Sequence, residues 1–251
     1  MVNLGSPEST SVKDVKKYLD EFLMDKRVIG KSYLFRFLLV KGIILNFRPK
    51  KSAAAYKKIW WKEGSPLIVL SQRLFDKVKK LITIPAALAM RYGSISIYNG
   101  IDELNKKGVD EIIVLPLYPH YAMSSYESVV VKVEEEILKN FSHIKTTVIP
   151  AFYNDPLYLK AMINNIKLHL KGIDYDYMLF SYHGLPESHL RISDPTNFHC
   201  QKKSCCEKDS VAHNTCYKHQ VFETTKSIAQ ALNLKEGSYS NAFQSRLANE
   251  P

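Results

Sequence analysis

Short apolar runs alternate with amphipathic segments along most of the chain. The runs are rich in apolar and β-branched residues, and they predict strands over 2–4, 81–90, 111–117, 146–151, 175–181 and 238–243. The segments between them carry apolar residues at helical spacing, which predicts helices over 11–23, 66–80, 101–107, 125–139, 156–170 and 220–232. Strands that alternate with helices indicate βαβ units, so we expect an α/β fold with a mostly parallel sheet and helices on both faces.

Three of the predicted helices begin with residues that favour helix starts. Ser11, Ser65 and Asp155 each stand immediately before the expected helix. Their side-chain oxygens can accept hydrogen bonds from the free backbone N–H groups of the first turn. Ser65 and Asp155 are also followed by a proline at the first helical position, where the missing N–H costs nothing.

The spread of six strands over 251 residues favours two α/β domains over a single barrel. We expect an N-terminal domain over residues 1–149 and a second domain over 150–251, with a Cys-rich loop at 199–216. The first strand is very short, and no helix follows the last one. We therefore expect the chain to be a fragment whose second domain is incomplete.

Composition excludes several classes of protein. Hydrophobic residues make up 45% and charged residues 24%, as in ordinary globular proteins. Four cysteines are too few for a disulfide scaffold. The longest apolar stretch, 35–47, is interrupted by Arg36, Lys41 and Asn46, which disfavours a membrane-spanning helix. The first residues lack the pattern of a signal peptide, so we expect a cytoplasmic protein.

The chain carries an excess of positive charge, with 35 Lys and Arg against 25 Asp and Glu, or +10. The lysines are scattered over the predicted helices and no zinc-finger or RNP-like pattern accompanies them, so we expect no nucleic-acid partner. A solvated surface, a polyanionic small ligand and an acidic membrane surface remain as explanations of the charge.

Aromatic and basic residues follow the predicted strands, where ligands bind in open α/β sheets. The segments that come after the six strands are 5–8, 91–93, 118–121, 152–153, 182–186 and 244–246. The glycine motifs of dinucleotide-binding and phosphate-binding loops are absent from the sequence. A flat, largely apolar ligand with a few anionic groups fits this composition, because rings can stack on it and arginines can hold carboxylates. The alternative is that the rings only pack the edge of the sheet.

His183 is the strongest single candidate for a catalytic residue. It follows an apolar strand that we expect to be buried, and the turn Gly184–Leu185–Pro186 comes directly after it. A histidine side chain can accept a proton or ligate a transition metal near neutral pH. A capping or packing role is the alternative, and His120 is the only other histidine expected near the ligand.

All four cysteines lie within one segment of 17 residues. Cys200, Cys205, Cys206 and Cys216 follow the spacing C-x4-C-C-x9-C. In a cytosolic chain such clustering indicates ligands for zinc or an iron–sulfur cluster before it indicates disulfides. The adjacent pair Cys205-Cys206 favours [2Fe-2S], while free thiols in a loop remain the alternative.

Six short motifs in this order resemble those of the ferrochelatase family, whose members insert ferrous iron into a porphyrin to make haem. They are NLGSPE at 3–8, KEGSP at 62–66, MRY at 90–92, LYPHY at 117–121, SYHGLP at 181–186 and AFQSR at 242–246. The resemblance covers the whole chain. It implies two Rossmann-like domains and a metal chelatase, a lyase of haem biosynthesis. Fe2+ is then a substrate, and the porphyrin is protoporphyrin IX or coproporphyrin III.

The resemblance also assigns roles to individual residues. It makes His183 the active-site histidine, which ligates the incoming iron or takes a pyrrole proton. It places Arg48, Tyr56 and Ser65 on the propionate side of the porphyrin, Arg91 and Tyr92 on the metal side, and Leu4 over the macrocycle. The acidic partner of the histidine falls beyond the AFQSR motif and is missing from this chain. Some bacterial members carry a [2Fe-2S] cluster at the place of the Cys segment.

Other functions remain open beside this one. A chelatase for another tetrapyrrole has the same fold, and a non-enzymatic porphyrin or haem carrier needs the pocket without a proton acceptor. A nucleotide-binding oxidoreductase is opposed by the missing glycine motif. The positive charge also favours peripheral association with an anionic membrane.

Overall fold

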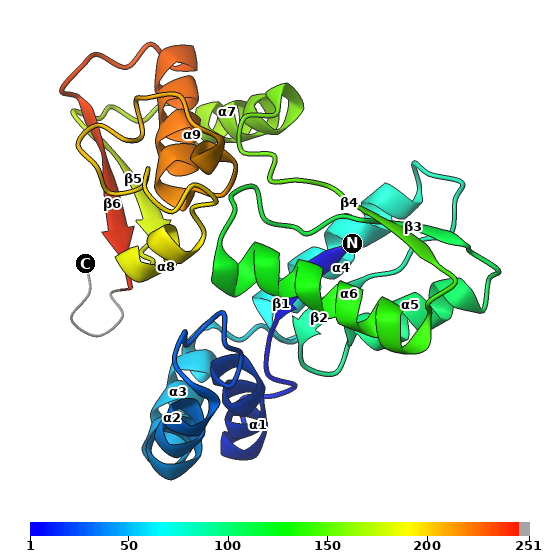
Figure 1. Ribbon diagram of the computed structural model, residues 1–251. Helices are drawn as coiled ribbons and strands as arrows, with labels where there is room; N and C mark the ends of the chain where they lie inside the picture. Colours follow the sequence, from blue (N-terminus) through cyan, green and yellow to red (C-terminus); the bar gives the residue numbers. More distant parts are fainter. Residues whose placement is uncertain (246–251) are drawn as a thin grey trace. The chain divides into compact units, whose positions relative to one another are not determined.

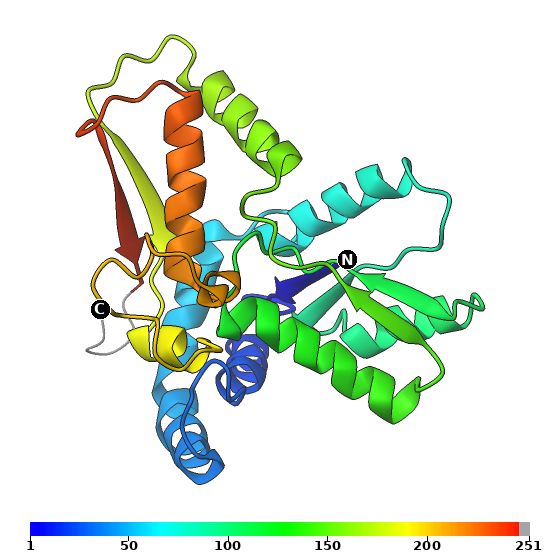
Figure 2. The same cartoon turned by 45° about the horizontal axis from the view of Figure 1, so that its top comes forward.

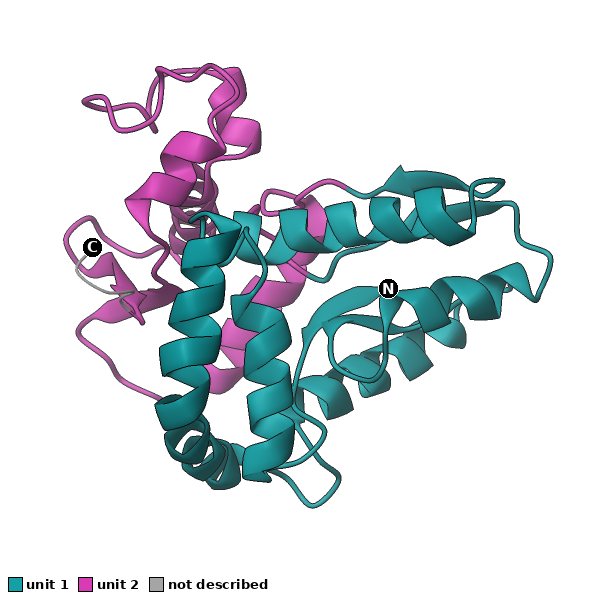
Figure 3. Cartoon of the chain, turned by 60° about the horizontal axis from the view of Figure 1, so that its bottom comes forward, with its two compact units in different colours: residues 1–117, 123–149 teal, residues 118–122, 150–251 magenta. Residues whose placement is uncertain are grey.

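The computed structural model describes residues 1–245, and these divide into two compact units, shown in different colours in Figure 3. Unit 1 contains residues 1–117 and 123–149, and unit 2 contains residues 118–122 together with the chain from Pro150 onward. The short segment 118–122, which includes His120, therefore packs with unit 2 although both of its flanking segments belong to unit 1.

Unit 1 is built from four short parallel strands and the helices that connect them (Figure 1). Its elements are β1 (Val2–Gly5), α1 (Val12–Leu23), α2 (Tyr33–Phe37), the π-helix η1 (Leu38–Ile44), α3 (Leu45–Ile59), α4 (Pro66–Lys79), β2 (Ala89–Tyr92), α5 (Ile97–Asn105), β3 (Glu111–Val114), the π-helix η2 (Met123–Glu127), α6 (Ser128–Asn140) and β4 (Lys145–Val148).

The strands of unit 1 are linked in the order β2-β1-β3-β4. β1 pairs with β2, and β3 pairs with β4, both in parallel. A parallel bridge between Val2 and Pro116 joins the two pairs: the Val2 N–H donates to the Leu115 carbonyl at 2.9 Å, and the Leu117 N–H donates to the Val2 carbonyl at 2.8 Å. The two views in Figures 1 and 2 place α4 and α6 on opposite sides of β1 and β2. The predicted α/β class with parallel strands is confirmed.

Up to residue 245, unit 2 contains one pair of parallel strands and the helices around it. Its elements are α7 (Pro156–Leu170), β5 (Met178–His183), α8 (Glu187–Ile192), the 3-10 helix η3 (Val211–Asn214), α9 (Tyr217–Ala231) and β6 (Tyr239–Gln244). β5 and β6 pair in register from Met178 opposite Tyr239 to His183 opposite Gln244. Thr225 of α9 bonds to both strands, because its hydroxyl lies 2.8 Å from the Tyr182 hydroxyl and 2.7 Å from the Asn241 side-chain oxygen.

The expectation that the strand before His183 is buried was wrong. Along β5 the side chains alternate between partly covered and exposed, and Leu179 is 60% exposed. Successive side chains of a strand point to opposite faces. Tyr182 therefore lies on the face that α9 covers, whereas Leu179 and His183 lie on a face left open by the residues that the structure describes.

Two other predictions of local structure need correction. The strand predicted over 81–90 is confined to β2, so Arg91 and Tyr92 lie within it and not after it. Pro85 lacks a backbone donor and disfavours regular structure in the preceding stretch. The long helical region from Tyr33 to Ile59 was not predicted, because it is apolar on several sides and Pro49 lies inside α3. Within residues 1–245, no helix combines the length and the apolar character needed to cross a bilayer.

All three predicted helix starts are confirmed, and two of the three residues cap their helix with the side chain. The Ser11 hydroxyl accepts from the Asp14 N–H, and the Asp155 carboxylate accepts from the Leu157 and Tyr158 N–H groups. Ser65 occupies the corresponding position before α4, but its hydroxyl makes no capping hydrogen bond.

Candidate functional site

The carboxyl ends of β1 and β2 carry three of the predicted site residues in unit 1. Leu4 lies in β1, and Arg91 and Tyr92 end β2. The two strands approach closely here: a Cβ added to Gly5, whose φ is +101°, would lie 1.9 Å from the Tyr92 carbonyl oxygen. Only glycine adopts this conformation without strain and leaves space for the neighbouring strand.

Ser65 and Tyr92 line the same cavity, which has a volume of about 380 Å³. Ser6, Glu8 and Trp60 contribute to its wall. Ser65 is buried, and the Ser6 hydroxyl is buried without a hydrogen-bond partner among the described residues. The structure thus brings together two residues that the resemblance assigned to opposite sides of a porphyrin, beside a donor that is free to bind a ligand.

Arg91 is held by a buried polar network. Its guanidinium Nη2 lies 2.7 Å from Asp25 Oδ2, and its Nε donates to Ser128 Oγ at 2.7 Å. The Asp25 side chain is 4% exposed and the Arg91 side chain 13%. The Tyr92 hydroxyl donates to the same Asp25 oxygen at 2.9 Å, and the Arg27 N–H donates to Asp25 Oδ1 at 2.8 Å.

The network fixes the charges of its members. Burial by itself would raise the pKa of Asp25, but hydrogen bonds from Ser128 and Arg27 and the positive charge of Arg91 outweigh it and lower that pKa. Burial raises the pKa of Tyr92 well above its usual range, so its phenol stays protonated. Arg91 and Asp25 therefore form a charge-compensated pair, and the Arg91 guanidinium is already engaged before any ligand arrives.

The other two porphyrin candidates of unit 1 lie on α3. Arg48 is exposed on this helix. Tyr56 is partly buried, and its ring packs edge-on against Tyr18 at 6.4 Å and Trp60 at 6.1 Å between ring centroids. Burial raises the pKa of Tyr56, which keeps its hydroxyl protonated. Tyr56 thus joins the cavity wall residue Trp60 to the helical core, while Arg48 is free to reach a carboxylate.

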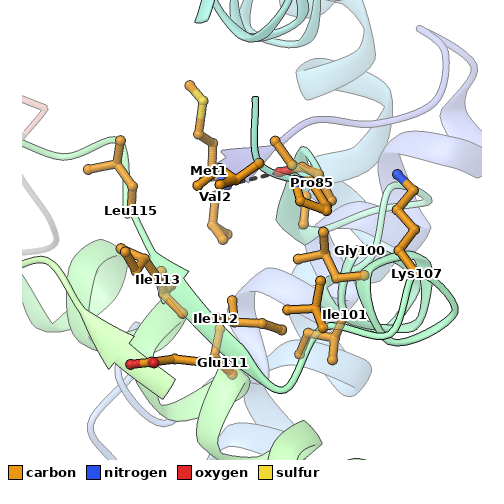
Figure 4. A pocket seen from close by; sticks show the side chains of 18 of the residues that line it. Met1, Val2, Pro85, Gly100, Ile101, Lys107, Glu111, Ile112, Ile113 and Leu115 are labelled. Atoms are coloured by element: carbon orange, nitrogen blue, oxygen red, sulfur yellow. Dashed lines mark hydrogen bonds between the residues drawn. The ribbon is translucent and has the colours of Figure 1, made fainter. Parts of the chain in front are cut away.

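A second cavity of unit 1 contains none of the predicted site residues. It has a volume of about 720 Å³ and lies against β1, β3 and α5 (Figure 4). Its wall is mostly apolar, with Val2, Ile101 and Ile112 among the residues that line it, and Lys107, Asp110 and Glu111 add charged groups. The Met1 ammonium closes one side by donating to the Ala87 carbonyl at 2.9 Å.

His183 in unit 2 is the last residue of β5, and its side chain is exposed. The strand is paired with β6 up to this residue, and the Gly184 N–H that follows donates to the Gln244 carbonyl at 2.6 Å. A Cβ on Gly184 would lie 2.9 Å from that carbonyl, so the turn after His183 requires glycine. Arg246, which we expected near this strand end, lies outside the described residues.

His120 is a packed histidine in this structure. Its ring lies edge-on to Tyr182 and to Tyr217, each at 5.9 Å between centroids, and its Nε2 is 2.9 Å from the Thr224 hydroxyl. Burial lowers the pKa of His120 to about 4, so the ring is neutral at pH 7. His120 supports the strand behind His183.

The four thiols of the Cys segment gather at the start of α9. Interaction with the Cys206 thiol, together with the His219 N–H that donates to the Cys216 sulfur at 3.5 Å, lowers the pKa of Cys216 to about 6. Cys205 interacts electrostatically with Cys200 and Cys206. Four clustered thiols, one of them poised as a thiolate, fit the donor chemistry of an iron–sulfur cluster. Within residues 1–245, no three acidic, His or Cys side chains converge on a single preformed metal position.

Polar contacts organise the loop that carries these thiols. The Asp194 carboxylate accepts from the backbone N–H groups of His199 and Cys200, each at 2.8 Å. The rings of His199 and His213 both donate to the Cys205 carbonyl, at 2.8 Å and 3.0 Å. These contacts hold the loop around its thiols without using the thiols themselves.

Sequence reasoning missed Asp25 and Ser128. Asp25 lies 66 positions from Arg91 and 103 positions from Ser128, so no local pattern connects these network partners.

Comparison with known proteins places the chain in a family. The family model described as Ferrochelatase matches residues 1–251. The chain is 45% identical over 255 residues to a ferrochelatase of Opitutus terrae, in a match that covers 100% of this chain and 74% of that protein. It is 44% identical over 250 residues to a ferrochelatase of Pseudomonas fluorescens, covering 98% and 73%, and 42% identical over 249 residues to one of Coxiella burnetii, covering 98% and 69%. The chain therefore belongs to the ferrochelatase family of metal chelatases, which insert ferrous iron into a porphyrin to make haem.

Proposed function

We propose that this protein inserts Fe2+ into protoporphyrin IX or coproporphyrin III and that His183 carries out the central step. The observation that supports this most is the placement of His183, whose exposed side chain ends a strand that is paired with β6 up to this residue. Metalation replaces two pyrrole protons with iron, so the site needs a proton acceptor and a ligand for the incoming metal. A neutral imidazole serves both purposes.

Unit 1 supplies the residues that bind the porphyrin in this proposal. Arg48, exposed on α3, holds a propionate by charge-assisted hydrogen bonds. Ser65 adds a hydroxyl on the same side, and Leu4 provides apolar contact with the macrocycle. Arg91 and Tyr92 line the metal side, and the pairing of Arg91 with Asp25 makes them a fixed wall instead of a carboxylate clamp.

An anaerobic metalation assay tests the proposal. The protein is mixed with excess porphyrin and Fe2+, and the loss of free-porphyrin fluorescence is followed for protoporphyrin IX and coproporphyrin III separately. We expect many turnovers per protein molecule with one of the two. A single stoichiometric change indicates a porphyrin or haem carrier, and turnover only with another divalent metal indicates a different chelatase. Either result contradicts the proposal.

We also propose that Cys200, Cys205, Cys206 and Cys216 hold a [2Fe-2S] cluster. The clustering of the thiols and the lowered pKa of Cys216 support it. When bound, such a cluster supplies a one-electron redox centre. Purified protein should show visible charge-transfer absorption with stoichiometric iron and sulfide. Colourless protein that contains only zinc, or no metal, contradicts this assignment.

A third part of the proposal is peripheral association with an anionic membrane. Large apolar residues are exposed along α2, η1 and the start of α3: Tyr33, Leu34, Phe35, Phe37, Leu38, Ile43 and Phe47, the last 78% exposed. Basic residues flank them at Lys31, Arg48 and Lys50. Such a surface binds at the lipid interface through apolar burial and attraction to anionic headgroups.

Vesicle sedimentation tests the membrane proposal. The protein should sediment with vesicles that contain phosphatidylglycerol and less with neutral vesicles. Replacing Leu34 and Phe35 with serine should weaken sedimentation, whereas the control Leu168→Ser, at an exposed position of α7, should not. Equal sedimentation of both variants contradicts the assignment of this surface.

A further inference from the structure

Asp194 is a buried carboxylate that no step of the proposed chemistry uses. It lies in unit 2, directly after Ser193 at the end of α8, and is 4% exposed. Each of its oxygens accepts two hydrogen bonds. Oδ1 accepts from the Thr196 N–H at 2.8 Å and from the Thr196 hydroxyl at 2.7 Å. Oδ2 accepts from the backbone N–H groups of His199 and Cys200, each at 2.8 Å. These bonds fold residues 194–200 into a defined turn that ends at the first cysteine.

The residue before Asp194 ties this turn to the other end of the Cys segment. The Thr215 hydroxyl donates to the Ser193 carbonyl at 2.6 Å, and the Ser193 hydroxyl donates to the Thr215 carbonyl at 3.2 Å. Thr215 directly precedes Cys216, which caps α9. The backbones of Cys200 and Cys216 are therefore linked through Asp194 and the pair of Ser193 and Thr215, and no thiol takes part in this link.

The backbone between the two ends has a conformation that needs such support. Asn197, Gln201 and Ser204 adopt positive φ values of 61°, 68° and 57°. This left-handed conformation is unfavourable for residues other than glycine, although asparagine tolerates it best. It persists where surrounding contacts impose it, and such positions cluster at ligand-binding sites. Asp194 accepts hydrogen bonds from residues on both sides of Asn197, so it imposes the first of these conformations.

We propose that Asp194 is the positioning residue of the Cys segment. It fixes the backbone on which Cys200 and Cys216 are brought near each other before a metal centre binds. Since no three metal-binding side chains within residues 1–245 converge on one position, the final approach of the thiols is left to rotation of their side chains. The loop then differs from a zinc finger, which folds only when its metal binds. This inference rests on the proposed [2Fe-2S] cluster and gives Asp194 no part in iron insertion.

Asp194→Asn tests the proposal, because it keeps the size of the side chain and replaces one acceptor oxygen with an NH₂ group. The purified full chain should contain less iron and sulfide than wild type. After metal removal and reduction, a Cd2+ titration followed by thiolate-to-cadmium charge-transfer absorption measures how readily the thiols close on a metal. We expect the Cd2+ affinity to fall at least about tenfold, the effect of about one lost hydrogen bond to a charged group. The control Asp209→Asn, at an exposed position of the same loop, should bind Cd2+ like wild type.

Amide hydrogen exchange in the metal-free chain distinguishes positioning of the loop from a general loss of structure. In Asp194→Asn the amides of His199 and Cys200 should exchange about tenfold faster, whereas the amides of β5 and β6 keep their protection. If β5 and β6 lose protection as well, Asp194 stabilises unit 2 as a whole and the proposal is overturned.

Thr215→Val tests the link to Cys216, because it keeps the branched side chain and removes the hydroxyl that donates to the Ser193 carbonyl. Cd2+ affinity should fall in this variant too, while the Cys200 amide keeps the exchange rate of wild type. Wild-type Cd2+ affinity in Thr215→Val contradicts the link between the two ends of the segment.

These outcomes separate the inference from the proposed cluster. Wild-type protein that is purified without iron and sulfide removes the [2Fe-2S] assignment, but the Cd2+ comparison still measures the role of Asp194. Equal Cd2+ affinities of wild type and Asp194→Asn overturn the inference, whatever metal the purified protein contains. A wild-type chain that binds no Cd2+ overturns it as well.

Discussion

Replacing Asp25 with asparagine should destabilise unit 1 more than any change of a surface charge. The substitution keeps the size of the side chain and removes its negative charge. Asp25 Oδ2 accepts hydrogen bonds from the side chains of Arg91, Tyr92 and Ser128. Asp25 Oδ1 accepts one from the Arg27 N–H. An asparagine amide turns its NH₂ group toward some of these donors in either orientation and leaves Arg91 buried without a counter-charge.

The expected cost follows from that geometry. Removing one partner of a buried ion pair costs about 3–5 kcal/mol. For a chain of this size, about 2–4 °C of Tm is lost per kcal/mol, so Asp25→Asn should lower the Tm by about 6–20 °C. The control Asp102→Asn removes a surface pair with Lys106, whose N–O distance is 2.6 Å, and should cost less than about 1 kcal/mol.

Tryptophan fluorescence provides the assay. The two tryptophans of the chain, Trp60 and Trp61, both belong to unit 1, so their emission during heating reports on its unfolding. The folded pKa of Asp25 lies below its ordinary 3.8, so the stability it contributes is present above that pH and is lost as the pH falls through the folded value. The Tm difference between wild type and Asp25→Asn should therefore shrink in strong acid. A Tm loss no larger than that of Asp102→Asn at pH 7 would refute the reasoning.

Three further predictions concern ligand binding, pH dependence and a tight approach of strands. Arg48→Ala should raise the porphyrin KM with a smaller change in kcat, because each charge-assisted hydrogen bond contributes about 1.5–3 kcal/mol to binding; steady-state kinetics with an unchanged KM would contradict the assignment. Stability should fall by up to about 3 kcal/mol as the pH drops from 6.5 toward 4, because the unfolded chain binds a proton that folded His120 does not. Urea unfolding followed by circular dichroism at pH 7 and pH 4.5 measures this loss, and His120→Gln should reduce it. Gly5→Ala should cost more than about 2 kcal/mol, since it adds a Cβ against the Tyr92 carbonyl at a positive φ; thermal unfolding that matches wild type would show that β1 can shift.

Sequence patterns predicted correctly those elements whose formation depends on neighbouring residues in the chain. α7 has the predicted bounds, Pro156–Leu170, because a capping Asp155, a proline at the first helical position and a clear apolar period act together. β1, β3 and β6 fall within a few residues of their predicted places. The region from Tyr33 to Ile59 carried no such signal, because its apolar residues surround the helix and many of them stay exposed.

The candidate site was predictable only in part, for a related reason. The rule that ligands meet the carboxyl ends of parallel strands selected Tyr92 and His183 correctly as strand-end residues. It did not show that Arg91 is bound to Asp25, because that contact depends on tertiary packing across 66 positions.

The most direct test of the central claim is the kcat of His183→Ala for iron insertion, measured together with porphyrin affinity by fluorescence quenching. Loss of a positioned proton acceptor lowers the rate by a factor of roughly 10² to 10⁴, and loss of a metal ligand lowers it further. The account predicts that turnover falls at least this far while porphyrin affinity changes little. His120→Ala should be milder, because His120 is packed behind the strand. If His183→Ala keeps most of its turnover, or loses folding and porphyrin binding together, His183 is a structural residue and the account is contradicted.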